Sequence, residues 1–245
     1  MKQNIVRTIA LSNCALAVVL GAAWLAQAEN TKAPYPSMAP LEQYLMDRDA
    51  EIALARSAAP ESISRDAEVL VLGQKGYETV IKGKNGFICM VARSWMSPFT
   101  SQEFWNPKIR GPECYNPPAV ESFLPYAVKE TAMALSGLSK SQIRDGIKAA
   151  VDKKELGVPA SGSLIYMMSK FAYFTDNNNP IFCHLMLDLP SMNGAAWGAN
   201  QEGTPVFFQQ LDPAPVTEFY VVMGKCSDGS PGTGVSNSGS DSHTH

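Results

Sequence analysis

Three short hydrophobic runs follow one another between residues 68 and 92, separated by glycine-containing turns. The runs are Glu68–Leu72, Tyr77–Lys82 and Phe87–Ala92, and the segments between them include Gly-Gln-Lys-Gly and Gly-Lys-Asn-Gly. β-Branched and aromatic residues favour strands, and glycine can adopt the positive φ that tight turns require. The pattern therefore predicts a three-stranded antiparallel meander.

Hydrophobic residues recur at three- and four-residue steps in three other parts of the chain, as expected for helices with one buried face. The first helix is expected at residues 41–59, before Pro60. The second begins at Pro117 or Ser122 and ends at Leu135, with a late start or a kink at Pro125. The third follows Ser139, because Ser139-Lys-Ser-Gln142 has the spacing of a capping box.

Four further apolar or β-branched runs occupy the last third of the chain, at residues 163–170, 181–189, 205–210 and 216–223. Segments rich in Asn, Gly and Pro separate them, and strands joined by short connections pair antiparallel. We therefore expect a single α+β domain with a mainly antiparallel sheet. It would comprise a three-stranded meander, two helices and four further strands, with the helices packed on one face.

Both ends of the chain differ from this domain. Lys2 and Arg7 precede a short apolar run, and Ala26-Gln27-Ala28 has the small-x-small pattern of a cleavage site. Residues 1–28 are therefore predicted to be a signal peptide, since an uncleaved anchor would need about 20 apolar residues. Residues 29–40 form a proline-containing lead-in, residues 41–224 the domain, and residues 225–245 a flexible Ser/Gly-rich tail. We expect a bacterial protein exported to the periplasm or the extracellular space, with no membrane insertion after cleavage.

Composition and charge narrow the classes of partner. With 45% hydrophobic and 18% charged residues, the chain has the composition of a globular protein. Removing residues 1–28 leaves 18 basic and 23 acidic residues, a net charge of about −5. Because phosphate binding requires clustered Lys and Arg, we expect no nucleic-acid partner.

Export changes the interpretation of the cysteines. Cys14 lies in the leader, and Cys89, Cys114, Cys183 and Cys226 remain, which allows three pairings in an oxidising compartment. A Cys89–Cys114 disulfide is favoured, because Cys89 lies in the last strand of the meander and Cys114 closes the irregular segment that follows. Cys183 and Cys226 are expected either to pair across neighbouring strands or to stay as buried thiols.

The segment from Arg93 to Pro118 combines five aromatic residues with five prolines, and it is predicted to be an irregular loop. One interpretation is that its aromatic and basic side chains line a cleft for an apolar or anionic ligand, with Trp95, Phe99, Trp105 and Arg110 as candidate ligand-binding residues. The alternative is that these rings cover the open face of the sheet and contribute only to the core.

Known catalytic and cofactor signatures are missing from the sequence. It has no G-x-S-x-G, H-E-x-x-H, phosphate-binding glycine loop or dinucleotide fingerprint, and we expect no cofactor. His184 is the only histidine outside the tail and no C-x-x-C is present, so we expect no metal site. His184 is either a fifth candidate ligand-binding residue, a general base paired with Asp188 or Glu103, or a hydrogen-bonded histidine on a half-buried strand.

Several short motifs together resemble an uncharacterised family of exported bacterial proteins. They are Ser57-Ala-Ala-Pro-Glu-Ser-Ile63, the GxNGFxC pattern of Gly83–Cys89, Tyr166-Met-Met168 and His184-Leu-Met186, together with Cys114 and Gly203-Thr-Pro-Val206. The resemblance implies a single exported domain and no known activity. We expect a non-enzymatic domain that binds a small molecule, a glycan or a protein partner through residues 93–118, the alternative being a hydrolase-like enzyme that uses His184 with a carboxylate.

Overall fold

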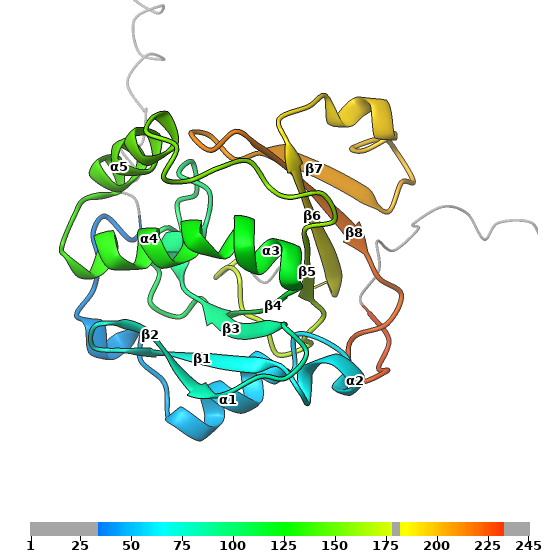
Figure 1. Cartoon of the computed structure of the whole chain (residues 1–245), viewed down its shortest axis with the longest axis horizontal. Coiled ribbons are helices and arrows are strands. Elements are labelled where there is room, and N and C mark those ends of the chain that lie inside the picture. Colours follow the sequence, from blue (N-terminus) through cyan, green and yellow to red (C-terminus); the bar gives the residue numbers. More distant parts are fainter. Residues whose placement is uncertain (1–33, 178–181, 233–245) are drawn as a thin grey trace, which may run out of the picture. The chain divides into compact units, whose positions relative to one another are not determined.

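The hydrophobic run Val69–Leu72 forms an inner strand of a single eight-stranded sheet (Figure 1). The computed structural model describes residues 34–177 and 182–232, which belong to one compact unit. The strands of the sheet are β1 (Glu68–Gly73), β2 (Gly76–Ile81), β3 (Ile88–Ala92), β4 (Gly111–Tyr115), β5 (Leu164–Met167), β6 (His184–Pro190), β7 (Val206–Gln210) and β8 (Val216–Val222).

The strands are ordered β2-β1-β3-β4-β5-β6-β8-β7, and all neighbours are antiparallel except β1 and β3. The α+β class with a mainly antiparallel sheet is confirmed, and so are the four late strands. The meander is wrong in one respect, because β3 does not pair with β2. Instead it pairs with β1 in parallel, through Glu68 with Ile88 and Val69 with Cys89.

Burial explains why β1 lies between two strands. Its residues Val69–Leu72 are all buried, which requires cover on both faces and a neighbour on both sides, whereas the middle of β2 is exposed. After β2 the chain returns past the start of β1, where Lys84 N donates to Asp66 O and Glu68 N donates to Phe87 O. Gly83 permits this close approach, because a Cβ there would lie 2.4 Å from Glu68 N.

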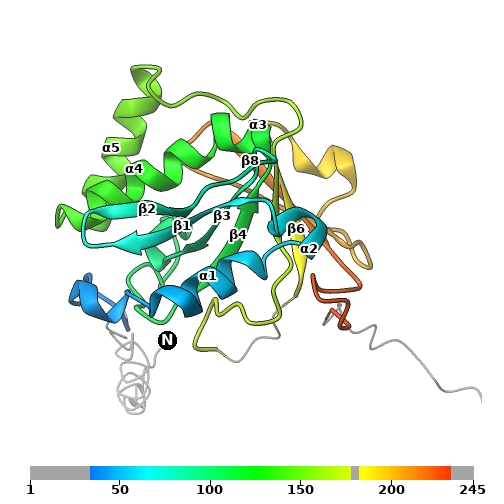
Figure 2. The same cartoon turned by 60° about the horizontal axis from the view of Figure 1, so that its bottom comes forward.

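Helices cover both faces of the sheet, in contrast to the expected single face. Helix α1 (Arg48–Arg56) packs its Ala55 against Val69, Cys89 and Cys114. On the other face, α3 (Pro117–Ser122) and α4 (Leu124–Leu135) cover a cluster that includes Met90 and Ile165. Figure 2 shows this arrangement, with β1, β3 and β4 between α1 and α4. The alternation of apolar residues toward both faces of β1 and β3 provides both contact surfaces.

The remaining helices are short, apart from α5 (Lys140–Asp152), which packs against α4. As predicted, Ser139 and Gln142 form a capping box at its start. The helix expected at residues 117–135 is divided at Phe123, because Pro125 lies at the first turn of α4. The other short helices are α2 (Glu61–Ser64) and the 3₁₀ helices η1 (Leu41–Gln43), η2 (Ser94–Met96) and η3 (Gly194–Trp197).

The helix expected at residues 41–59 is shorter than predicted. Helix α1 begins at Arg48, because the Asp47 carboxylate accepts hydrogen bonds from Asp49 N and Ala50 N and caps the first turn. Preceding it, Tyr44 is fully buried, and its hydroxyl donates to Trp105 O at 2.8 Å. Tyr44 lies in the turn that separates η1 from α1.

The segment 93–118 is more regular than an irregular loop. It contains η2 and the fully buried strand β4, and it ends in the first residues of α3. The prediction missed β4 because Gly111-Pro112 stands at its start, a pair that usually marks a turn. Pro112 is tolerated there because the cost of a proline in a strand falls on one ladder hydrogen bond, and the five-residue register with β3 supplies the others.

Two disulfides link the strands to one another and to the C-terminal segment. Cys89–Cys114 joins directly opposed residues of β3 and β4, which confirms the favoured pairing. Cys183–Cys226 is the second bond, so these two cysteines are not free thiols. Residues 225–232 are therefore not part of a flexible tail: Cys226 is bonded to Cys183, and Ser227 N donates to Met168 O at 2.8 Å.

One buried ion pair connects α1 to the centre of the sheet. The Arg93 guanidinium contacts the Glu51 carboxylate at 2.8 Å, and both side chains are at most 1% exposed. Arg93 Nε also donates to Tyr44 O, and Glu51 Oε1 accepts from Leu72 N. Each charge is thus surrounded by backbone partners as well as by the opposite charge.

In the described part of the chain, we find no helix with both the length and the apolar character needed to span a membrane. The predicted signal peptide, the two tail histidines and residues 233–245 lie outside the described residues.

Candidate functional site

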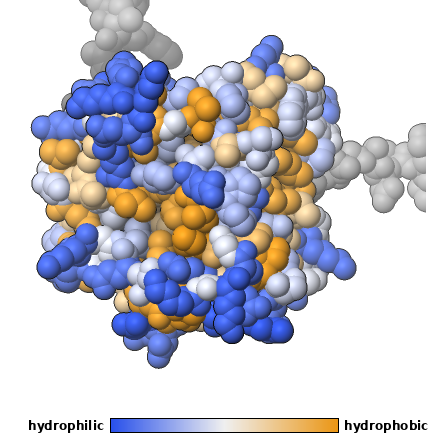
Figure 3. Space-filling model, viewed as in Figure 1, coloured by the Kyte–Doolittle hydropathy of each residue, from blue (hydrophilic) through white to orange (hydrophobic). Residues whose placement is uncertain are grey.

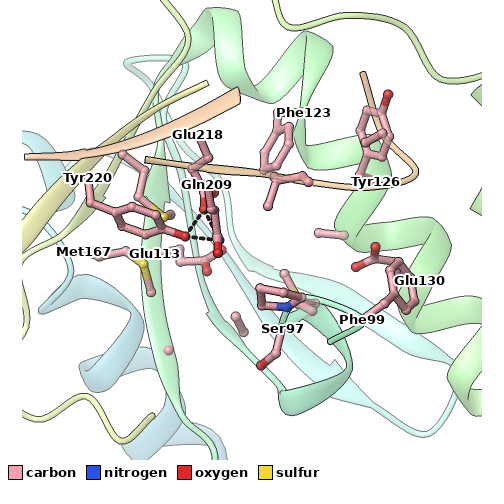
Figure 4. A pocket seen from close by; sticks show the side chains of 18 of the residues that line it. Ser97, Phe99, Glu113, Phe123, Tyr126, Glu130, Met167, Gln209, Glu218 and Tyr220 are labelled. Carbon is pink, nitrogen blue, oxygen red and sulfur yellow. Dashed lines mark hydrogen bonds between the residues drawn. The ribbon is translucent and has the colours of Figure 1, made fainter. Parts of the chain in front are cut away.

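A cavity of about 450 Å³ lies between α4 and the face of the sheet that α4 covers. The segment after β3, including Ser97 and Phe99, forms one part of its wall, and Phe123, Tyr126 and Glu130 form another. Figure 4 shows Glu113, Glu218, Gln209 and Tyr220 on the strands facing them. Figure 3 shows the face of the molecule seen in Figure 1, where hydrophobic residues lie in the middle among hydrophilic ones.

Strand alternation brings the polar lining side chains together. Residues two apart on a strand share a face, so Glu113 and Tyr115 of β4 point the same way, as do Glu218 and Tyr220 of β8. The pairings Met186 with Tyr220 and Gln209 with Glu218 place β6, β7 and β8 in register. Acids from strands 105 residues apart in the chain thereby line one cavity.

Each of the two strand acids is held by a tyrosine hydroxyl. Tyr115 OH donates to Glu113 Oε2, and Tyr220 OH donates to Glu218 Oε2. Gln209 Nε2 donates to the same Glu218 oxygen at 2.9 Å. These bonds fix the carboxyl groups, while Oε1 of each residue has no hydrogen-bond partner among residues 34–177 and 182–232.

Burial raises the pKa of three acids that line the cavity, Glu113, Glu130 and Glu218. It raises the pKa of Glu113 to about 8, against the opposing effect of the Tyr115 hydrogen bond, and the charge of Glu218 adds to the increase. The pKa of Glu130 is also raised to about 8, by burial and then by the charge of Glu113. The pKa of Glu218 is raised by burial, although its bonds from Tyr220 and Gln209 oppose the shift. These carboxyls bind protons far more tightly than exposed ones.

Asp188 of β6 extends this acidic group into the sheet. It is fully buried, and it stands directly opposite Glu218 on β8. Neither of its carboxyl oxygens has a hydrogen-bond partner among the described residues. Burial, followed by the charges of Glu218 and Glu113, raises the pKa of Asp188 well above its usual range, so Asp188 is held in the neutral form.

His184 also lines the cavity, but as a neutral side chain. Its Nδ1 is 2.9 Å from Phe182 O, and its ring lies against Phe182, Tyr220 and Phe174. Burial lowers its pKa, against the effect of the Phe182 carbonyl. Asp188 is four residues along the same strand, about 13 Å away by strand geometry. Glu103 bonds to Asn106, Thr175 and Asp176 instead. Neither proposed carboxylate partner therefore contacts His184.

The two candidate tryptophans lie in the core. Trp95 is fully buried, and its Nε1 donates to Thr131 Oγ1 of α4 at 3.0 Å. Trp105 packs edge-on against Phe104 in the same hydrophobic cluster. Neither lines the cavity, so for these two rings the core interpretation agrees with the structure.

Of the other candidates, Phe99 and His184 line the cavity and Arg110 does not. The Arg110 guanidinium donates to the carbonyls of Pro107, Ile109 and Gln43. Burial, followed by the charge of Arg93, lowers the Arg110 pKa to about 10. Arg110 therefore fastens the segment 93–118 to the residues before α1, and the candidate set is only partly brought together.

Sequence reasoning missed Glu113, Glu130 and Glu218. One signal was available, because Val216-x-Glu218-x-Tyr220 places a single acid on an otherwise apolar strand face. Met186-x-Asp188 gives the same signal on β6. Glu113 had no such context, since β4 itself was not recognised.

No group of three His, Cys, Asp or Glu side chains within residues 34–177 and 182–232 is arranged to hold a metal ion. Comparisons of the chain with protein-family models, with curated proteins and with solved structures found no match.

Proposed function

We propose that this protein is an exported, non-enzymatic domain that binds a small molecule in the cavity between α4 and the sheet. The observation that carries the proposal is the cavity itself. Its volume of about 450 Å³ is that of sites for drug-sized ligands, and apolar and aromatic walls with a few fixed polar groups are typical of such sites. Residues 97–100 contribute to it, so the aromatic segment takes part through Phe99 rather than through its tryptophans.

The cysteines and the predicted leader support the proposed compartment. Two disulfides are typical of proteins that fold in an oxidising environment. The basic and apolar residues at the start of the chain, with Ala26-Gln27-Ala28, support export by a cleaved signal peptide. A periplasmic or extracellular binding domain combines these features.

Hydrolysis by His184 receives less support than binding. A histidine that acts as general base becomes an imidazolium, which a carboxylate partner stabilises, whereas the described partner of His184 is a backbone carbonyl. The tyrosine bonds to Glu113 and Glu218 fix the polar groups in one orientation, as a binding site requires.

The test is to fill the cavity mouth and measure the uptake of a neutral fluorescent probe. N-phenyl-1-naphthylamine fluoresces in apolar surroundings, and its aromatic rings suit the aromatic wall. We expect one molecule to bind per chain and Ser97→Trp to abolish binding, because Ser97 lines the cavity. Gln102→Trp is the matched control, since Gln102 is exposed on the same segment. No uptake by the wild type, or equal uptake by Ser97→Trp, would contradict the proposal.

A further inference from the structure

Three carboxyl groups line the cavity without a basic side chain paired to any of them. Glu113, Glu130 and Glu218 reach it from β4, α4 and β8, and none takes part in a salt bridge within the described part of the chain. Glu113 is 8% exposed and Glu218 is 5% exposed. Buried carboxyls are normally paired with a cation or with several donors, so this arrangement is unusual for a purely structural role.

Each of the two strand acids keeps one oxygen available. Tyr115 and Tyr220 occupy Oε2 of Glu113 and Glu218, which leaves Oε1 of both residues without a partner in residues 34–177 and 182–232. Neither Oε1 is among the buried side-chain atoms that lack a hydrogen-bond partner, so each keeps some accessible surface, and both residues line the cavity. The tyrosines hold the two carboxyl groups in position, and the Oε1 atoms of Glu113 and Glu218 stay available to a ligand.

The two arginines that line the cavity, Arg93 and Arg144, have partners other than the cavity acids. Arg93 is bonded to Glu51 and to the backbone of Tyr44 and Val91. Arg144 pairs with Asp145 at the exposed surface of α5. Neither arginine forms a salt bridge with Glu113, Glu130 or Glu218, so a ligand could supply a positive partner for these acids.

Aromatic rings surround the same space. Phe99, Phe123, Tyr126, Phe174 and Tyr220 all line the cavity. The face of an aromatic ring carries negative potential and attracts a desolvated cation. Rings combined with acids suit a cation that has an apolar body, because the rings also bury hydrocarbon surface.

We propose that the cavity binds an organic ammonium ion, with its ammonium group at the free oxygens of Glu113 and Glu218 and its apolar body against Phe99, Phe123 and Tyr126. This inference rests on the proposed binding function and names its ligand class. A neutral sugar could use the same hydrogen-bonding atoms, but it would not favour the ionised form of the carboxyls over the protonated form.

Binding is then coupled to proton release. The raised pKa of Glu113 means that it is largely protonated near neutral pH, and an ammonium ion beside it favours the ionised form. Ammonium binding at pH 7 should therefore displace protons from the protein. The other titratable and charged groups that line the cavity are Arg93, Tyr115, Tyr126, Glu130, Arg144, His184, Asp212, Glu218 and Tyr220. The charge of Glu113 also acts on Tyr77 of β2 and Asp188 of β6.

The test is calorimetric titration of the whole folded chain with three probes that differ in one terminal group: 4-phenylbutylamine, 4-phenylbutanol and 4-phenylbutyrate. We expect the amine to bind roughly tenfold or more tightly than the alcohol, and the carboxylate to bind most weakly. Glu113→Gln should reduce the amine preference to within about twofold, because glutamine keeps the shape and loses the charge. Glu121→Gln, at an exposed position on α3, should leave it unchanged.

Proton release is measured in the same experiment by titrating the amine in two buffers of different ionisation enthalpy. Equal or tighter binding of the alcohol by the wild type would overturn the inference, whether or not the variant folds. If N-phenyl-1-naphthylamine binds and no amine preference is found, the ligand class is wrong and the proposed function stands. If no probe binds, both fall.

Discussion

Replacing Glu113 by glutamine should change how the stability of the protein depends on pH. Glutamine has the size of glutamate, and its carbonyl oxygen can still accept the hydrogen bond from Tyr115 OH. It removes the titrating carboxyl and little else. Since Glu113 is only 8% exposed, the effect should not be diluted by solvent screening as it is for a surface acid.

The size of the effect follows from the raised pKa. In the folded chain the Glu113 pKa is about 8, against an ordinary value of 4.5, so the folded state holds the proton more tightly. The stabilising contribution of Glu113 is therefore complete below pH 4.5, declines between pH 4.5 and 8, and is lost above pH 8. The slope is about 1.4 kcal/mol per pH unit, which gives an upper limit of roughly 5 kcal/mol over this range.

The assay is urea unfolding of the wild type and of Glu113→Gln at pH 5, 6, 7 and 8. The free energy of unfolding of the variant, relative to that of the wild type, should rise steadily with pH. The other acids are present in both chains, so the difference between the two chains isolates Glu113 and any coupling to it. A difference that stays constant from pH 5 to 8 would refute the account, because it would mean that Glu113 titrates normally.

Two further predictions concern the framework around the site. Glu51→Gln should lower the free energy of unfolding by about 3–5 kcal/mol, because it leaves the Arg93 charge buried without its partner. Glu61→Gln, in an exposed pair with Arg65, should cost less than about 1 kcal/mol in the same urea assay, and equal costs would contradict the buried-pair interpretation. Replacing Cys183 and Cys226 by serine removes a cross-link over 43 residues and should cost about 4 kcal/mol, seen as a lower melting temperature; an unchanged temperature would contradict it.

Local signals in the sequence were enough for much of the fold. The capping box at Ser139 and Gln142 determines where α5 begins, and Pro125 divides α3 from α4. The apolar and β-branched runs of the last third predict β5 to β8, because such residues favour strands and turn-forming segments separate the runs. The Cys89–Cys114 pair was predicted because Cys89 lies in the last strand of the expected meander and Cys114 closes the segment that follows.

The features that depend on distant contacts were not predictable in this way. The parallel pairing of β3 with β1 follows from the need to bury β1 on both sides, which no turn motif records. Strand β4 is hidden by Gly111-Pro112, and its identity depends on the ladder with β3. The cavity acids come from strands and a helix far apart in the chain, so their proximity depends on strand order.

For Trp95 and Trp105, residue type was a poor guide to function. Both are large aromatic residues in a proline-rich segment, a pattern that fits a binding loop and a core cover equally well. The structure distinguishes the two interpretations, because Trp95 bonds to Thr131 and Trp105 packs against Phe104 inside the core.

The central claim is that the cavity between α4 and the sheet binds an organic ammonium ion. A crystal structure of the protein grown with 4-phenylbutylamine tests this most directly. The account predicts electron density in the cavity, with the nitrogen within about 3 Å of Glu113 Oε1 or Glu218 Oε1 and the phenyl ring beside Phe123 and Tyr126. An empty cavity in crystals of protein that binds the amine in solution would contradict it, as would a ligand whose nitrogen points away from both carboxyls.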